Sequence, residues 1–481
     1  MVQVDSPSLR RGSNLTLGLS YEKRILEQPW LSHHYTLSNG IETPPSDIST
    51  PVLDKDLNWL LESAAASRLD IPSVISSSDA PTVAVLGVGY VGTHLVSAFA
   101  SKYPVIGFDV SKSRVNSLRA AQLDEAADDL KDIEYTWEPT SLRRATHLLI
   151  SVPTLLRPNR TVDTSFLCKA LQTVEKHARP GATIVIESSV AVGMTRELLG
   201  PLAAQNGFFA GMSPERVDPG RTEPPVASIP KIISALEDLR PGSLDSIMRI
   251  YSSVFAAVVP VSSPEVAEMT KLYENCQRMI CIAYANEMAD ACTAHGIDPY
   301  EVCRAAATKP FGYMNYTPGL GVGGHCIPVN PFYLLSNSKF PLLEQATKRM
   351  HERPQRIALG ILDDLYAKRS SGELGQKPRV LAVGMGFKKG QSTLSHSPGL
   401  ELLKTLYSIG EVDVTWADSH VLQEAIHSVP KLQNERWNSD DLATFDLILV
   451  AFLQPDMDEA VLHALPAHVE VKWLGMQRER S

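Results

Sequence analysis

Short apolar segments alternate with amphipathic stretches along most of the 481-residue chain. Each segment has the length of a β-strand and is too short for a helix that packs in a core. The segments are Val83–Leu86, Val105–Asp109, Leu148–Val152, Thr183–Glu187, Arg379–Gly384, Val412–Trp416 and Leu447–Ala451. Apolar strands that alternate with helices are typical of parallel, doubly wound sheets. The pattern therefore predicts an α/β fold with two Rossmann-like doubly wound domains joined by a long central helical connector.

The predicted connector rests on a change of period. From Pro264 to Ala307 apolar residues recur at helical spacing, which predicts one long helix or two joined helices. Ser397 and Pro398 predict the start of another helix, because serine caps and early prolines favour helix N-termini. The chain thus divides into an extended N-terminal tail (1–80) with a helix predicted at 53–68, a first α/β domain (81–260), a central helical domain (261–372) and a second α/β domain (373–481).

Composition narrows the class of protein. The chain has 45 Lys and Arg against 54 Asp and Glu, a formal net charge of −9. This balance disfavours nucleic-acid binding, which normally needs a basic surface. No apolar run approaches the ~20 residues of a membrane helix, and the N-terminus lacks the apolar core of a signal peptide. Six cysteines are too few for a disulfide scaffold. We expect a cytoplasmic protein that binds neither nucleic acid nor membrane.

The first α/β domain opens with a dinucleotide-binding motif. Gly87, Gly89 and Gly92 form a G-x-G-x-x-G that follows a predicted strand and opens a helix. Asp109 ends the second strand, where a carboxylate would bind ribose hydroxyls and repel a 2′-phosphate. These features favour NAD over NADP, although Arg114 could instead receive that phosphate. The motif residues assigned to the cofactor are Gly87, Gly89, Tyr90, Val91, Gly92, Asp109 and Arg114.

A second glycine-rich segment, Pro318–Pro328, ends in a cysteine. Its four glycines leave backbone amides open to a ligand, and Cys326 follows them. Composition alone leaves two interpretations of Cys326 open, a nucleophile or a packed structural thiol. The other cysteines of the helical connector form no C-x-x-C pair, so no metal site is predicted.

Five separated motifs carry a family resemblance. GVGYVG, SPERVDPG, AEMTKLYEN, PGLGVGGHCIP and GMGFKKG occur in the order and spacing of the UDP-glucose/GDP-mannose 6-dehydrogenase family. Their wording most resembles the UDP-N-acetylmannosamine and UDP-N-acetylglucosamine dehydrogenase branch, from about Thr82 to the C-terminus. The resemblance implies a homodimer formed through the connector. It also implies NAD-dependent oxidation of the C6 alcohol of a UDP-sugar to the uronate, through a cysteine thiohemiacetal and thioester.

The same resemblance implies roles for individual residues. Cys326 matches the nucleophile, Lys271 and Asn275 match the groups that stabilise oxyanions, and Glu215 matches the acid that moves protons and activates water. Each also has a structural interpretation, such as a helix-surface charge or a cap. Further matches are Thr154 and Glu187 near the cofactor, and Gly321, Gly323, Phe387 and Lys388 near the substrate.

Four positions depart from the family pattern. Val190 replaces a Thr or Ser, and Asn330 replaces an Asp, where both family residues help to place the hydrolytic water. Gly312 and Ser395 stand where the family has arginines, which bind phosphate well. These departures leave alternatives open: a relative that oxidises a non-nucleotide alcohol, one that stops at the aldehyde, or a non-catalytic NAD-binding scaffold.

Overall fold

The computed structural model describes residues 80–124, 132–217, 223–372 and 377–475, which form two compact units. The first unit takes in the described parts of Glu42–Met279 and Val329–Glu344. The second takes in the described parts of Ile280–Pro328 and Gln345–Ser481. The predicted tail, with its helix at 53–68, lies outside the described residues.

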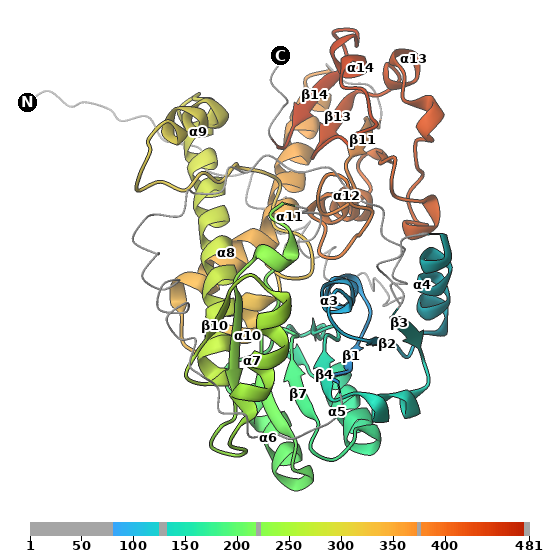
Figure 1. Cartoon of the computed structure of the whole chain (residues 1–481). Coiled ribbons are helices and arrows are strands. Elements are labelled where there is room, and N and C mark those ends of the chain that lie inside the picture. Colours follow the sequence, from blue (N-terminus) through green and yellow to red (C-terminus); the bar gives the residue numbers. More distant parts are fainter. Residues whose placement is uncertain (1–79, 125–131, 218–222, 373–376, 476–481) are drawn as a thin grey trace, which may run out of the picture. The chain divides into compact units, whose positions relative to one another are not determined.

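An eight-stranded sheet, with the strand order β10-β9-β8-β7-β4-β1-β2-β3, forms the centre of the first unit (Figure 1). All four strands predicted here are confirmed, within two residues at their ends. The strands are β1 (Val83–Leu86), β2 (Val105–Phe108), β3 (Ile133–Thr136), β4 (His147–Ile150), β7 (Thr183–Ile186), β8 (Phe209–Met212), β9 (Lys231–Ala235) and β10 (Val258–Pro260); β5 (Leu155–Leu156) and β6 (Val162–Asp163) form a separate hairpin.

One strand pair corrects the prediction of a parallel sheet. β9 runs antiparallel to β8, with Gly211 opposite Ala235, whereas the other pairs of this sheet are parallel. A parallel return would need a crossover helix. The described residues between β8 and β9 contain only the short 3-10 turn η4 (Val226–Ser228). The first residue of β9 therefore lies at the edge where β7 and β8 end.

Helices cover both faces of this sheet, as the doubly wound prediction requires. Side chains of α5 and α6 pack on one face with Ile184 and Leu148. Side chains of α3 and α7 pack on the other face with Val83 and Val185. The helices of this unit include α3 (Tyr90–Ala100), α4 (Lys112–Asp124), α5 (Ser165–His177), α6 (Met194–Asn206), α7 (Ser243–Val254) and α10 (Asn330–Leu335); η3 (Pro139–Arg144) is a 3-10 helix.

The second unit contains a smaller parallel sheet of four strands, in the order β12-β11-β13-β14. The predicted helix after Ser397 is confirmed, and the Ser397 side chain caps it by accepting from Leu400 N–H at 3.2 Å. The strands are β11 (Arg379–Val383), β12 (Asp413–Ala417), β13 (Leu447–Val450) and β14 (Glu470–Trp473); its helices include α11 (Pro341–Ser370), α12 (Pro398–Ile409), α13 (Ser439–Leu442) and α14 (Ala460–His463).

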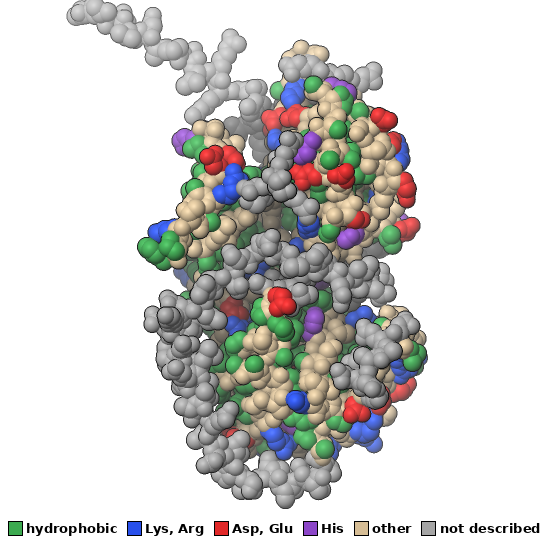
Figure 2. All heavy atoms as spheres, turned by 45° about the horizontal axis from the view of Figure 1, so that its top comes forward, with side chains coloured by type: hydrophobic (Ala, Val, Ile, Leu, Met, Phe, Trp, Pro, Cys, Tyr) green, Lys and Arg blue, Asp and Glu red, His purple; other side chains and the backbone are tan. Residues whose placement is uncertain are grey.

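The connector consists of two helices rather than one. α8 (Pro264–Ala294) and α9 (Pro299–Ala307) are separated by a turn in which Gly296 has a φ of +67°. Among the described residues, no helix combines the length and apolar character needed to cross a bilayer. Acidic and basic side chains both occur on the face of the molecule that Figure 2 shows.

Candidate functional site

The turn between β1 and α3 carries the three glycines of the dinucleotide motif. Gly87 has a φ of +88°, which residues with a side chain rarely adopt. A Cβ on Gly92 would lie 1.9 Å from the Gly87 carbonyl oxygen, so the fold itself requires glycine there. A Cβ on Gly89 would meet no atom within 4 Å. The fold does not require glycine at this position, whereas the approach of a pyrophosphate does.

Asp109 and Arg114 both contact this turn from the segment after β2. The Asp109 Oδ2 accepts a hydrogen bond from the Val88 N–H at 3.1 Å, and its Oδ1 accepts from the Ser111 N–H at 2.9 Å. Arg114 donates its Nε–H to the Val88 carbonyl at 2.9 Å. The carboxylate is thereby held beside the glycine turn, and part of the guanidinium group is occupied by the backbone.

These residues fit a dinucleotide. α3 begins at Tyr90 and Val91, and its N-cap residue Gly89 has no side chain that could bond the first amides of the helix. Such amides bind phosphate, and a carboxylate at Asp109 suits the ribose hydroxyls. Thr154 lies in the segment that joins β4 to the β5–β6 hairpin, at the same edge of the sheet as the glycine turn.

Two carboxylates and an ammonium group meet at the edge where β7 and β8 end. Glu187 follows β7, Glu215 lies shortly after β8, and Lys231 begins β9. The Lys231 Nζ lies 2.6 Å from Glu187 Oε2 and 3.0 Å from Glu215 Oε2. Tyr251 of α7 donates its hydroxyl to Glu187 Oε1. All four side chains are buried. We call Glu187, Glu215, Lys231 and Tyr251 the acid cluster.

Burial and charge act in opposite directions on the pKa values of this cluster. Burial raises the pKa of Glu187 to about 7, although the Lys231 charge opposes the shift. Burial alone would also raise the pKa of Glu215, but Lys231 and two backbone N–H groups lower it. For Lys231 burial would lower the pKa, and the two carboxylates raise it instead. Glu215 and Lys231 are therefore ionised at neutral pH. Glu187, with a pKa of about 7, is partly protonated there.

The sequence assigned Glu187 to the cofactor and Glu215 to proton transfer, and it gave no role to Lys231 or Tyr251. In the structure both carboxylate oxygens of Glu187 bond Lys231 and Tyr251 instead, and its contact with the cofactor stays a prediction. Tyr251 lies on α7, and its side chain is completely buried. Lys231 begins the apolar run Lys231–Ala235, and a lysine at the start of a buried strand is a signal that could have identified it.

Lys271 and Asn275 lie one turn apart on α8, as their spacing predicts. Lys271 is buried, and Asn275 is half-buried. The Asn275 Nδ2–H donates to the side-chain oxygen of Asn330, the first residue of α10. Asn330, which stands where the family pattern has Asp, is therefore held against Asn275 in the first unit.

The segment after β7 shows what the substitution at Val190 does. Val190 is 2% exposed and belongs to the apolar core of the first unit. The nearby Ser188 hydroxyl donates to the Val152 carbonyl at 2.8 Å, which ties the end of β7 to the segment after β4. Val190 thus contributes packing where the family pattern supplies a hydroxyl.

In the second unit, the glycine-rich segment before Cys326 is anchored at both ends. At its start, Gly319 donates its N–H to Asn286 Oδ1 at 2.9 Å and accepts from Arg353 Nε–H at 3.0 Å. At its end, Gly324 donates its N–H to the Ser395 carbonyl at 2.9 Å and accepts from His396 Nδ1–H at 3.1 Å. The half-buried Cys326 lies two residues after this second anchor.

Phe387 explains why the end of this segment is glycine. A Cβ on Gly323 would lie 2.8 Å from Phe387 Cβ, and one on Gly324 would lie 2.9 Å from Phe387 Cε2. Gly321 packs near Pro354 and Pro398, with 3.3 Å and 3.4 Å to an added Cβ. Phe387 and the next residue, Lys388, follow β11 and are half-buried. The segment that ends in Cys326 is thus packed on the second α/β domain.

Of the two positions with expected arginines, Gly312 has a local explanation and Ser395 has none. Gly312 has a φ of +68°, in which an arginine would be strained. Ser395 uses its carbonyl to hold Gly324, and its hydroxyl lies 3.1 Å from His396 Nδ1. The nearby Lys309 stacks its ammonium group over the Phe311 ring at 5.3 Å.

The predicted site residues are distributed over both units. The glycine turn, Thr154, the predicted acids and the α8 pair Lys271 and Asn275 belong to the first unit. Gly321, Gly323, Cys326, Phe387 and Lys388 belong to the second. Within each unit some predicted residues lie close together. Glu187 and Glu215 follow neighbouring strands at the same edge of the sheet, and Gly323 packs on Phe387.

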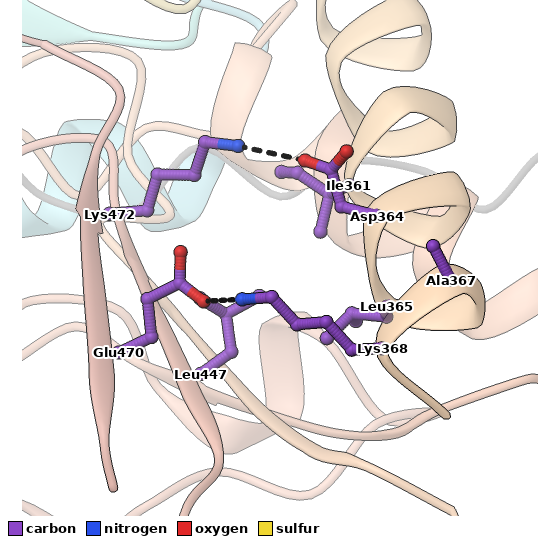
Figure 3. Close-up of a pocket in the computed structure, with 8 residues that line it drawn as sticks. All are labelled: Ile361, Asp364, Leu365, Ala367, Lys368, Leu447, Glu470 and Lys472. Atoms are coloured by element: carbon purple, nitrogen blue, oxygen red, sulfur yellow. Dashed lines mark hydrogen bonds and ion pairs between the residues drawn. The ribbon is translucent and has the colours of Figure 1, made fainter. Parts of the chain in front are cut away.

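A separate hollow of about 260 Å³ lies between α11 and the strands β13 and β14 (Figure 3). Two ion pairs span it, Lys368 with Glu470 at 2.5 Å and Lys472 with Asp364 at 3.4 Å. Figure 3 shows each ammonium group directed at its carboxylate. All four charges are paired and partly exposed, and no cysteine and none of the predicted site residues line the hollow, so it is not the candidate site.

The doubly wound domains and the glycine turn define a dinucleotide-binding α/β protein. The chain matches the UDP-glucose/GDP-mannose dehydrogenase family, in its NAD binding domain over residues 81–254 and its central domain over residues 265–349. These matches cover more than half of the chain, so it belongs to this family. The predicted family, fold class and NAD cofactor are confirmed, and the chain is an NAD-dependent dehydrogenase.

Individual relatives agree with the predicted branch. Protein CapL of Staphylococcus aureus is 34% identical over 346 residues, covering 68% of this chain and 80% of that protein. The UDP-N-acetyl-D-glucosamine 6-dehydrogenase of Pseudomonas aeruginosa is 32% identical over 375 residues, covering 72% and 84%. The solved structure of a UDP-D-ManNAc dehydrogenase from Pyrococcus horikoshii has a TM-score of 0.67 at 25% identity, covering 82% and 99%. The roles of single residues stay predictions.

Proposed function

We propose that this protein oxidises the C6 alcohol of a UDP-sugar to the carboxylate. The similarity to the UDP-N-acetyl-D-glucosamine 6-dehydrogenase carries the proposal, because it extends over 84% of that enzyme. An N-acetylated hexose is therefore the first sugar to test. On the protein side, Gly323, Gly321, Phe387 and Lys388 are the groups that would contact the nucleotide sugar.

The reaction removes four electrons in two steps. One alcohol, two NAD⁺ and one water give one carboxylate, two NADH and three protons. NAD, when bound, accepts a hydride from C6 in each step. Between the steps, the Cys326 thiolate adds to the C6 aldehyde to give a thiohemiacetal. Loss of the second hydride turns this adduct into a thioester, which water then cleaves. Cys326 thus leaves the cycle unchanged.

The first unit supplies the groups for charge and proton movement. The Lys271 ammonium stabilises the negative charge that develops on the C6 oxygen, and Asn275 retains one N–H for the same oxygen after bonding Asn330. Glu215, which is ionised at neutral pH, accepts a proton from the attacking water.

Val190 and Asn330 favour a second candidate function, oxidation that stops at the aldehyde. Neither residue offers the hydroxyl or carboxylate that would place a hydrolytic water, and Val190 is packed in the core. The replaced arginines at Gly312 and Ser395 motivate a variant of this idea, with a non-nucleotide alcohol as substrate. The UDP-N-acetyl-D-glucosamine 6-dehydrogenase among the relatives favours a nucleotide sugar over a non-nucleotide alcohol, and an enzyme over a non-catalytic scaffold.

We also propose that two chains associate through α8. Large apolar side chains recur along this helix and are exposed, as in Tyr273 at 72% and Tyr284 at 61%. Val266, Met269 and Met288 extend the pattern. Light scattering of wild type and of Tyr284→Glu tests this: a dimer that the variant converts to monomer is expected, and two monomers would contradict it. A cytoplasmic location stays a prediction.

Purified protein with NAD and a panel of UDP-hexoses tests the proposed function. We expect NADH formation with one or more UDP-N-acetylhexosamines, and the uronate as product. An aldehyde trapped by hydroxylamine, with one NADH for each product, would favour the second candidate. If no UDP-sugar gives NADH while a relative works under the same conditions, the proposal is wrong.

A further inference from the structure

Lys231 is a buried lysine that contacts both acids of the acid cluster. Its side chain is 4% exposed, and its Nζ bonds Glu187 and Glu215. We propose that Lys231 is a positioning residue for the proton-transfer step: it holds the Glu215 carboxylate in one orientation and in its ionised form. The inference rests on the proposed function of Glu215, and it assigns Glu187 and Tyr251 the task of holding Lys231.

The contacts of Glu215 show why its orientation depends on Lys231. Glu215 Oε1 accepts from the N–H groups of Arg216 at 2.7 Å and Val217 at 2.8 Å. Oε2 accepts from Lys231 at 3.0 Å. A carboxylate has about four acceptor sites, so, among the contacts of the described residues, these bonds leave one, on Oε2. Because Lys231 occupies the other site of that oxygen, it decides where the remaining site points. The Glu215 side chain is 10% exposed, so a water can reach it.

Strand direction brings Lys231 to this place. β9 is antiparallel to β8, so its first residue lies beside the last residues of β8 and β7. In a parallel strand, the first residue would lie at the opposite edge of the sheet. Glu187 then bonds Lys231 at 2.6 Å and Tyr251 bonds Glu187. The cluster is thus a chain of contacts that ends on Glu215.

The charged surroundings of Glu215 predict a pH effect. The groups that face Glu215 are Lys231, Glu187, Tyr251 of α7 and His94 of α3. The adjacent Arg216 is paired with Glu274 of α8 at 2.7 Å. Burial favours the protonated Glu215 carboxyl and so raises its pKa, whereas the Lys231 charge lowers this pKa. Without that charge the pKa of Glu215 rises, so a base at Glu215 is lost at a higher pH.

The pH profile of kcat for Lys231 variants tests the inference. Lys231→Met combined with Glu187→Gln removes the lysine without leaving two unpaired buried carboxylates. We expect kcat of this double variant at neutral pH to fall about tenfold or more, with KM for the UDP-sugar within about threefold. Its acid limb should move up by about one pH unit or more. The single variant Lys231→Arg, which keeps the positive charge, should keep the acid limb of the wild-type pH profile.

Glu268→Gln is the matched control. Glu268 is also buried in the first unit, where it accepts from the Gly193 and Thr195 N–H groups at 2.6 and 2.8 Å, away from the acid cluster. This variant should lose stability and keep the acid limb of wild type. If the acid limb of the double variant coincides with that of wild type, the inference is overturned. Loss of a lysine with only a structural role would lower stability without moving the acid limb.

A second measurement separates this inference from the proposed function. If wild type makes no carboxylate from any UDP-sugar, the proposed function fails. The interaction between Lys231 and Glu215 can still be measured, as a coupling in the equilibrium constant for unfolding. In a Glu187→Gln background, the cycle of Lys231→Met and Glu215→Gln should show a coupling of about tenfold in the unfolding equilibrium constant. A coupling below about twofold would refute the positioning role by itself.

Discussion

The Lys231 ammonium nitrogen lies 2.6 Å from Glu187 Oε2, and the two side chains are 4% and 0% exposed. Such a pair loses its hydration on folding, so removing one partner is expected to destabilise far more than removing both. The pair joins residues 44 positions apart, which only the strand order brings together.

Glu187→Gln should reduce the pH dependence of stability. The pKa of Glu187 is about 7 in the folded chain and ordinarily 4.5, so between these values the folded state holds a proton that the unfolded state has released. This contribution is complete below pH 4.5 and is lost as pH rises through 7, by up to about 1 kcal/mol per pH unit. Urea unfolding at several pH values measures it. Parallel curves for both proteins in this window would contradict the assignment.

Gly89→Ala should weaken NAD binding without unfolding the protein. A Cβ at Gly89 meets no protein atom within 4 Å, so we expect a melting temperature close to that of wild type. The same methyl group would stand where the pyrophosphate approaches, and we expect the Kd for NAD to rise about tenfold or more. Calorimetry and thermal unfolding measure the two effects. Gly92→Ala, whose Cβ would lie 1.9 Å from the Gly87 oxygen, should instead lower stability. Unchanged NAD affinity in Gly89→Ala would contradict the turn as cofactor site.

Gly323→Ala should distort the segment before Cys326. Its Cβ would lie 2.8 Å from Phe387 Cβ and 3.0 Å from Pro398 Cδ, and overpacking of this kind costs about 1–3 kcal/mol. We expect lower stability and a large loss of kcat. Gly319→Ala is the control in the same segment, because its Cβ meets nothing within 4 Å. Equal effects of the two substitutions on kcat would show that packing on Phe387 does not hold the segment.

His396 should anchor the Cys326 segment through its ring. His396 has a φ of +49°, and its Nδ1–H donates to the Gly324 carbonyl at 3.1 Å. Glycine tolerates this φ but has no donor, whereas asparagine tolerates it and has one. His396→Gly should therefore change the alkylation rate of Cys326 by iodoacetate about fivefold, the value of one hydrogen bond, and His396→Asn should change it less. The anchor would be refuted if His396→Gly reacted like wild type.

The parts of this fold that sequence predicts are the local ones. β1 and the glycine turn follow from an apolar run and three glycines within ten residues, and the Ser397 cap follows from two adjacent residues. β9 has the same apolar character, yet nothing local indicates its antiparallel direction. A lysine at the start of this strand can be noticed in the sequence, but its pairing with Glu187 and Glu215 cannot, because the pairing depends on the strand direction.

Two departures from the family pattern also gain a physical explanation. Sequence comparison marks Gly312 as a lost arginine, whereas the φ of +68° shows a turn that suits glycine. It marks Asn330 as a lost carboxylate, whereas the side chain still bonds Asn275. Backbone angle and pairing partner depend on the folded chain, so residue identity alone could not supply them.

The ratio of NADH to carboxylate, measured in wild type and in Cys326→Ala, tests the central claim most directly. With a UDP-N-acetylhexosamine, the account predicts two NADH for each uronate in wild type and no uronate in Cys326→Ala, because the thioester requires the thiol. A ratio of one with a trapped aldehyde in wild type, or undiminished uronate formation by Cys326→Ala, would contradict it.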